Sequence, residues 1–225
     1  MSGLYVQCGC GFSAPEDWKN FDASPTLRFE RLPVIGRLFT KNASRFPENV
    51  RYGDIVKGLP LADGTVDAVY ASHILEHLAL NDFHVALHNI WRLLKAGGVF
   101  RLIVPDLRWR AEVYVGASAD GDPEASSAFL RSCYLGIETR PRGLWRIMIS
   151  AFGSSKHLWM WDEPAISGAL QAAGFHNIRR IKIGDSTDPM FAKVEEEGRF
   201  FDGAHPELAM EAIKPSVVLR NSNEP

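Results

Sequence analysis

Two glycines and an aspartate near the start of the chain have the types and spacing of a nucleoside-binding site. Leu4–Cys8 is a short apolar run that predicts a buried parallel strand. Gly9 and Gly11 follow it, where a backbone without Cβ atoms can turn sharply and lie close to a ligand. Asp22 ends a second predicted strand, Trp18–Asp22, and its carboxylate could accept hydrogen bonds from the hydroxyls of a ribose. Because Gly-x-Gly is common, the same residues also fit an ordinary tight turn.

A second pattern with chemical meaning, H-x-x-E-H, runs from His73 to His77. It is the signature of inverted zinc peptidases, whose metal ligands lie on a long helix with a further acidic ligand downstream. Here the motif follows a predicted buried strand without a break, and Leu78–Asn81 interrupts any helix. The sequence therefore argues against a peptidase, and we expect no metal ligands.

The elements that would position these residues alternate between strands and helices. Besides the first two strands, we expect strands over Asn49–Ile55, Val66–Ser72, Val99–Val104, His176–Gly184 and Glu207–Lys214, and helices from Ser24-Pro25, over Asn81–Lys95, around Pro123–Tyr134 and from Asp162. This order predicts a doubly wound, mostly parallel sheet, whose last strand is antiparallel, with ligands above the carboxyl ends of the strands. The residues expected at that edge are Gly9–Gly11, Asp22, Asp54, Ser72-His73 and Pro105-Asp106.

Composition sets limits on the class of protein. The chain has 225 residues, is 46% hydrophobic and carries 27 acidic against 25 basic side chains, a formal charge of −2. This balance does not favour nucleic acid or a membrane surface as a partner. The absence of a leader or of a long apolar run predicts a cytoplasmic protein without a membrane span. Three cysteines, Cys8, Cys10 and Cys133, predict reduced thiols.

Several segments together resemble the class I S-adenosylmethionine-dependent methyltransferases, in the branch with the methyltransferase type 11 domain. They are Gln7–Gly11, Trp18–Asp22, Leu59–Val69, Ser72–His77, Leu93–Gly98, His157–Glu163 and Ala172–Phe175. The resemblance implies a seven-stranded Rossmann-like methyltransferase fold and S-adenosylmethionine as cofactor. It also implies a single domain over residues 1–215, with variable acceptor-side segments at 24–48 and 107–160 and a tail at 216–225.

The same resemblance implies positions for the cofactor. Gly9, Cys10 and Gly11 would lie against its methionine and ribose parts, Asp22 would hold the ribose hydroxyls, and Asp54 and Ile55 would lie beside the adenine. The methionine end would be bordered by Gln7, Ser72 and His73.

Two departures from the family pattern leave alternatives open. The first strand usually ends in an acidic residue where this chain has the neutral Gln7, and the loop from Phe12 to Trp18 scarcely holds the usual helix. One alternative is therefore a catalytically inactive protein that binds S-adenosylmethionine. Another is an NAD-dependent dehydrogenase, since Ala14 could stand at the last position of G-x-G-x-x-G.

Methyl transfer to a hydroxyl or ammonium requires removal of a proton. We expect His77 or His73 to take it, because histidine titrates near neutral pH. Asp106, His157 and Trp159 would contact the acceptor, together with aromatic and arginine residues between 140 and 161. The acceptor is expected to be a small molecule, and the resemblance suggests a sugar or polysaccharide precursor. The oligomeric state is not predicted.

Overall fold

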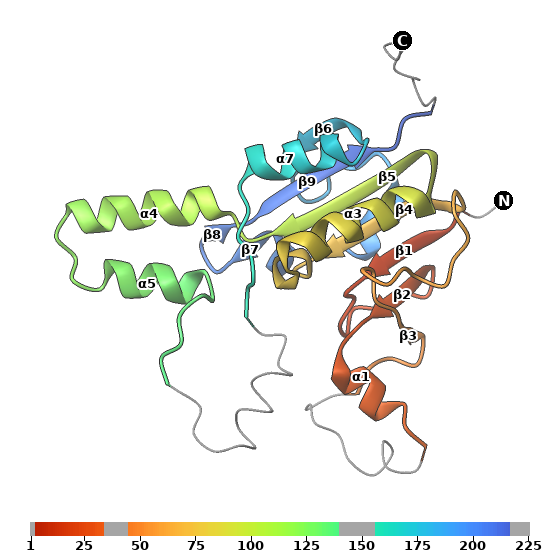
Figure 1. Cartoon of the computed structure of the whole chain (residues 1–225), viewed down its shortest axis with the longest axis horizontal. Helices are drawn as coiled ribbons and strands as arrows, with labels where there is room; N and C mark the ends of the chain where they lie inside the picture. Colours follow the sequence, from red (N-terminus) through yellow and green to blue (C-terminus); the bar gives the residue numbers. More distant parts are fainter. Residues whose placement is uncertain (1–2, 34–44, 140–155, 217–225) are drawn as a thin grey trace.

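Short apolar runs form the centre of the protein, a seven-stranded sheet (Figure 1). The computed structural model describes residues 3–33, 45–139 and 156–216. The strands lie in the order β3-β2-β1-β4-β5-β9-β6. Their bounds are β1 Tyr5–Cys8, β2 Trp18–Asp22, β3 Val50–Tyr52, β4 Val66–Ser72, β5 Leu94–Val104, β6 His176–Arg180 and β9 Leu208–Ile213.

The order of the strands reverses between β1 and β4, whose carboxyl ends lie at the same edge of the sheet. β1 pairs in parallel with β2 and β4, and β2–β3 and β4–β5 are also parallel. β9 is antiparallel to both β5 and β6. This confirms the predicted fold, a mostly parallel doubly wound sheet with a last antiparallel strand. In such sheets, ligands bind above the carboxyl ends of the strands at the point of reversal.

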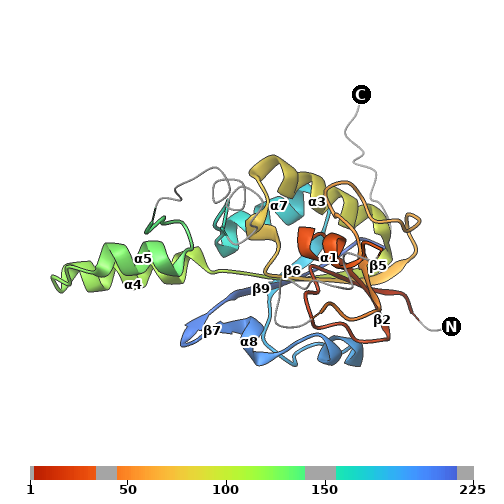
Figure 2. The same ribbon diagram turned by 90° about the horizontal axis from the view of Figure 1, so that it is seen from below.

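Helices cover both faces of the sheet (Figure 2). One face carries α3 Leu80–Leu93 and α7 Glu163–Ala172, and the other carries the segment with the 3₁₀ helix η2 Pro189–Lys193 and α8 Glu197–Phe200. The periodicity predicted for α3 is confirmed, because its apolar residues Phe83, Ala86, Leu87, Ile90 and Leu93 are all buried. The short helix α1 Pro25–Glu30 begins at an N-cap, Ser24, as expected.

A pair of helices, α4 Leu107–Ala119 and α5 Ala125–Ser132, projects from the end of β5 (Figure 1). α4 was not predicted. The reason is physical: its one buried residue is Arg110, while Val113 and Val115 are exposed, so it has no apolar stripe. Its N-terminus is capped by Asp106, whose carboxylate accepts from the Arg108 and Trp109 amides.

Other boundaries differ from the predicted ones. The helix α3 ends at Leu93, and β5 already begins at Leu94 because Leu94 pairs with Val66. The predicted strands at Asn49–Ile55 and His176–Gly184 are both shorter, β3 ending at Tyr52 and β6 at Arg180. The hairpin of β7 Phe201–Asp202 and β8 His205–Pro206 was not predicted.

A buried arginine fastens the connection between β6 and β9 to the sheet. Arg101 of β5 is fully buried and forms ion pairs with Asp185, Glu195 and Glu211, the last at 3.1 Å. Removing one partner of such a pair strands a buried charge, which is strongly destabilising. The network therefore fixes the residues that follow Glu195, and these reach the edge of the sheet where the site is built.

In the described ranges, none of the helices combines the length and the apolar character needed to cross a bilayer. The aromatic and arginine residues expected at 140–155 fall outside the ranges that the structure describes.

Candidate active site

The glycine turn after β1 gives two different environments to its two glycines. Gly9 and Gly11 have φ angles of +63° and +55°, a left-handed conformation that side chains disfavour. A Cβ on Gly9 would lie 1.8 Å from Cγ2 of Ile74, whereas a Cβ on Gly11 would meet nothing within 4 Å. Gly9 is thus needed for packing against the loop after β4, and Gly11 leaves its backbone open to a ligand.

Asp22 ties this turn to the end of β2. Its Oδ2 accepts from the Gly11 amide at 3.1 Å and its Oδ1 accepts from the Ser24 amide at 2.7 Å. Each carboxylate oxygen can accept more than one hydrogen bond. Asp22 is therefore held in place beside Gly11 and retains the capacity to bind two hydroxyls.

Gln7 precedes the turn and is almost completely buried, with 1% of its surface exposed. Within the described residues, neither its amide nitrogen nor its amide oxygen has a hydrogen-bond partner. Buried amides are nearly always hydrogen-bonded, so an unpaired one at a sheet edge marks a position where a ligand would supply the partner.

Asp54 and Ile55 lie beyond the end of β3 and differ in how far their side chains are exposed. Asp54 accepts from the Val56 amide at 3.0 Å and pairs with Lys57 at 3.3 Å, with its side chain partly exposed. The side chain of Ile55 belongs to the main hydrophobic core and is only 6% exposed. Asp54 thus remains accessible to a ligand, whereas Ile55 offers little surface to one.

Cys10 is buried in a small apolar cluster with Leu27, Phe46 and Val50. Burial, together with the nearby charge of Asp22, raises the pKa of the Cys10 thiol to about 12. The thiol is therefore unsuited to act as a nucleophile, and Cys10 as a whole is buried.

Beyond β4 and β5, a cavity of about 410 Å³ opens beside the turn that follows β4. Its lining includes His73, Glu76, His77 and His157 on one part of the wall. Arg110 and Glu207 form another part, joined by two hydrogen bonds of 3.0 Å. The cavity is therefore rich in groups that can carry or exchange protons.

His73 is fixed by partners on both ring nitrogens. Nε2 lies 2.9 Å from the Arg199 carbonyl oxygen, and Nδ1 lies 3.5 Å from Oε1 of Glu76. Burial lowers the pKa of His73, but Glu76, the Arg199 carbonyl and Glu207 outweigh it and leave the pKa raised. Both nitrogens thus face acceptors within the protein, which favours the protonated ring and leaves no lone pair free to take a proton from a bound molecule.

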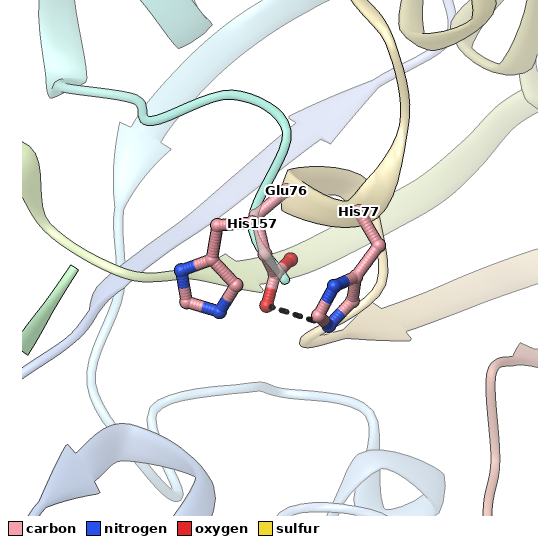
Figure 3. Close-up of side chains that lie close together, drawn as sticks. All are labelled: Glu76, His77 and His157. Atoms are coloured by element: carbon pink, nitrogen blue, oxygen red, sulfur yellow. Dashed lines mark ion pairs between the residues drawn. The ribbon is translucent and has the colours of Figure 1, made fainter. Parts of the chain in front are cut away.

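Glu76, His77 and His157, here the Glu76–His77–His157 cluster, converge on one point of the cavity wall (Figure 3). One ligand atom of each residue lies within 4.8 Å of those of the other two. His77 Nδ1 is 2.9 Å from the Lys156 carbonyl oxygen, so this nitrogen donates and Nε2 keeps its lone pair. His77 Nε2 lies 3.9 Å from Glu76 Oε1.

The histidine from the distant segment is held in the cluster by the backbone. The carbonyl oxygen of Glu76 accepts from the amides of Leu158 at 2.7 Å and Trp159 at 3.1 Å. Burial lowers the pKa of His157 and outweighs Glu76 and the Cys133 backbone, which act in the opposite direction. His157 is therefore a neutral imidazole beside a buried carboxylate.

Residues 6–102 match the model of a family described as methyltransferase domain. The match begins in β1 and ends in β5, so it contains the glycine turn, Asp22, Asp54 and the His73–His77 segment. Residues 6–102 therefore form a methyltransferase domain. The protein is accordingly an S-adenosylmethionine-dependent methyltransferase, and S-adenosylmethionine is its cofactor.

Solved structures with a similar chain course include a methyltransferase from Thermotoga maritima, described as a possible histamine N-methyltransferase. It is 16% identical, with a TM-score of 0.47, and the alignment covers 95% of this chain and 83% of that one. A methyltransferase from Archaeoglobus fulgidus is 14% identical, with coverages of 94% and 86% and a TM-score of 0.46. Phosphoethanolamine N-methyltransferase 2 from Haemonchus contortus is 13% identical, with coverages of 95% and 49% and a TM-score of 0.48. No curated protein sequence matches this chain.

The edge of the methyltransferase sheet fits S-adenosylmethionine. The open backbone at Gly11, the two carboxylate oxygens of Asp22 and the unpaired amide of Gln7 offer surface and hydrogen bonds for the methionine and ribose parts. No helix begins between Gly11 and Trp18. A dinucleotide pyrophosphate would therefore lack the helix N-terminus that normally receives it, which disfavours a dehydrogenase.

The structure separates the predicted site residues into two places. Gly9, Gly11, Asp22 and Asp54 follow β1, β2 and β3, whereas His73, His77 and His157 line the cavity next to β4. Ser72, the last residue of β4, is buried between the two places.

Of the three predicted acceptor contacts, His157 lines the cavity, but Asp106 and Trp159 do not. Asp106 instead caps α4 and pairs with Arg180 at 2.8 Å, which occupies both carboxylate oxygens. We therefore do not assign it to the acceptor.

Sequence reasoning missed Arg110, Glu207 and Tyr134, which line the cavity. Arg110 and Glu207 are 97 residues apart in the chain, and neither belongs to a sequence motif. A signal for Arg110 was present, because Asp106 is a good N-cap for a helix on which Arg110 lies one turn later.

The two glycines of the turn predict different degrees of destabilisation by the same substitution. Gly9→Ala should lower the free energy of unfolding by about 2–5 kcal/mol, because it adds left-handed strain and a clash with Ile74. Gly11→Ala should cost only about 1–2 kcal/mol, because no atom stands near its Cβ. Thermal and urea denaturation measure both, and Ile74→Ala should partly rescue Gly9→Ala. Equal destabilisation by both substitutions would contradict these packing environments.

Proposed function

We propose that this enzyme methylates a hydroxyl group of a small molecule that binds in the cavity next to β4, with a sugar or polysaccharide precursor as the acceptor class. The observation that supports this most directly is the position of the cavity. It begins at His73, directly after β4, and is lined by side chains that can bind and deprotonate a hydroxyl. Its volume of about 410 Å³ suits a small molecule.

When bound, S-adenosylmethionine supplies a methyl carbon on a sulfonium, which the lone pair of the acceptor attacks in line with the departing sulfur. Asp22 and Gly11 hold the ribose side of the cofactor, and the unpaired amide of Gln7 contacts its methionine end. Holding the partners in line and excluding water is the main task of the protein in such a displacement.

Loss of the acceptor proton depends on His77. Of the two predicted catalytic histidines, His73 has acceptors on both nitrogens, whereas His77 directs a free Nε2 lone pair toward the cluster. Glu76 lies beside it, with Oε1 3.9 Å from His77 Nε2. His73, whose Nε2 lies 2.9 Å from the Arg199 carbonyl oxygen, then acts as a positioning residue for this segment.

The opposite wall selects for a polar acceptor. Arg110 is buried and donates hydrogen bonds from two of its nitrogens to Glu207, so this pair presents a fixed arrangement of hydrogen-bonding groups. Phe201 and Tyr134 add aromatic surface to the lining. Aromatic faces and paired polar groups together suit a hydroxylated ring.

The experiment is an acceptor screen that measures S-adenosylhomocysteine formed from S-adenosylmethionine. Panels of monosaccharides and nucleotide sugars are compared with amines, RNA and protein at equal concentrations. We expect turnover above the acceptor-free rate with hydroxylated small molecules. Turnover confined to amines, RNA or protein would overturn the proposed acceptor class.

A further inference from the structure

We propose that the Glu76–His77–His157 cluster is a binding site for one divalent transition-metal cation, at the acceptor end of the cavity. The inference rests on the proposed function only for the role of the cation, not for its binding. It departs from the sequence-based expectation that this chain has no metal ligands. It also differs from the peptidase pattern, because His73 is not a member of the cluster and the motif continues β4 into a single 3₁₀ turn, η1 Leu75–His77.

The first observation is the state of Glu76. Only 1% of its surface is exposed, and within the described residues neither carboxylate oxygen has a hydrogen-bond partner. The nearest groups are His73 Nδ1 at 3.5 Å and His77 Nε2 at 3.9 Å, both too distant for a charge-assisted hydrogen bond. A buried carboxylate without such bonds is costly, and a bound cation would compensate it.

The second observation is the orientation of the histidines. His77 donates Nδ1–H to the Lys156 carbonyl oxygen at 2.9 Å, which leaves Nε2 deprotonated and aimed at the cluster. Metal-bound histidines characteristically donate their other nitrogen to a carbonyl or carboxylate in this way. His157 directs its Nε2 toward the Glu76 carboxylate, with Nδ1 on the far side of the ring (Figure 3).

The geometry and the donor set agree with a first-row transition metal. Two imidazoles and one carboxylate are ligands that zinc, iron, cobalt and nickel accept. The three ligand atoms lie within 4.8 Å of one another. Zinc binds such atoms at about 2.0–2.2 Å, so small side-chain rotations would bring all three into contact with one ion.

Such a site would serve the acceptor rather than the cofactor. Three protein ligands leave coordination positions open, and these face the cavity where we place the acceptor hydroxyl. A metal ion lowers the pKa of a hydroxyl that it binds, so the hydroxyl proton can pass to solvent water. The His77 lone pair would then act through the cation, as its ligand.

The test is calorimetric titration of the chelator-treated full chain with Zn²⁺, repeated with Co²⁺ while the visible absorption is recorded. No cofactor or acceptor is present. We expect one ion per chain and cobalt absorption bands typical of nitrogen and oxygen ligands. Glu76→Gln and His157→Gln should each weaken binding at least tenfold, with circular dichroism showing that each variant is folded.

The matched control is His88→Gln. His84 and His88 are exposed on α3 at a spacing of four residues, where they form a surface pair that could bind metal adventitiously. His88→Gln should leave the stoichiometry and affinity unchanged. Absence of stoichiometric binding by the wild type, equal affinity in Glu76→Gln and His157→Gln, or loss of binding in His88→Gln would each overturn the proposal.

The same titration separates this inference from the proposed function. Zinc binding without any methyl transfer to hydroxylated small molecules would refute the acceptor class and leave the cation site standing. Methyl transfer that is unchanged by chelation, in a protein that binds no zinc, would refute the cation site alone.

Discussion

Asp22→Ala is expected to weaken binding of S-adenosylhomocysteine by at least about a hundredfold. In this account, the carboxylate accepts two hydrogen bonds from ribose hydroxyls. Hydrogen bonds to a charged group contribute roughly 1.5–3 kcal/mol each, and each 1.4 kcal/mol is about tenfold in affinity. The substitution also removes the acceptor of the Gly11 amide, which orders the open side of the turn. Isothermal titration calorimetry of both proteins measures the difference.

Two controls separate a lost ribose contact from a damaged loop. Asp22→Asn keeps one oxygen in place and should lose less affinity than Asp22→Ala. Ser24→Ala removes the N-cap of α1 but not the Asp22 carboxylate, so its affinity should stay within about twofold of the wild type. If Asp22→Ala binds as tightly as the wild type, Asp22 is not the ribose ligand.

His77→Gln is expected to lower kcat by roughly 10²–10⁴-fold with the acceptor found in the screen, which is the usual contribution of a group that assists proton loss. The loss follows whether Nε2 takes the proton itself or binds a cation that lowers the acceptor pKa. Glutamine can still donate to the Lys156 carbonyl, so the local structure should persist. Affinity for S-adenosylhomocysteine should change by less than about twofold, because His77 belongs to the acceptor end.

His73→Gln provides the comparison in the same segment. It removes the contacts to the Arg199 carbonyl and Glu76, so we expect a smaller fall in kcat together with a lower melting temperature. An unchanged kcat in His77→Gln, or a larger loss in His73→Gln than in His77→Gln, would contradict the role given to His77.

The cofactor half of the site could be predicted because it is built from local sequence signals. Buried strands read as apolar runs, and the parallel order brings their carboxyl ends to one edge whatever the loops do. Gly9, Gly11 and Asp22 therefore stand at the strand ends where the sequence predicted them, and their contacts with the cofactor stay a prediction. Ile55 is the exception, since an apolar residue after a strand can face either a ligand or the core, and here it faces the core.

The acceptor half depends on contacts that no local pattern contains. α4 has no apolar stripe and was missed, and with it the buried Arg110. Glu207 and the Arg199 carbonyl belong to a connection that is held by the buried charges of Arg101 and Glu195 and by the ion pair of Arg101 with Asp185. From sequence alone, a charged residue is predicted to lie on the surface, because charged side chains are rarely buried without a partner. Here the partners lie far away in the chain, so no local pattern reveals them.

The measurement that tests the central claim most directly is a crystal structure of the full chain with S-adenosylhomocysteine. The account predicts the ribose hydroxyls on the carboxylate of Asp22, the backbone of Gly11 against the nucleoside, and the sulfur directed toward the cavity that contains His77. A ligand bound elsewhere, or one at this edge whose sulfur faces away from that cavity, would contradict it.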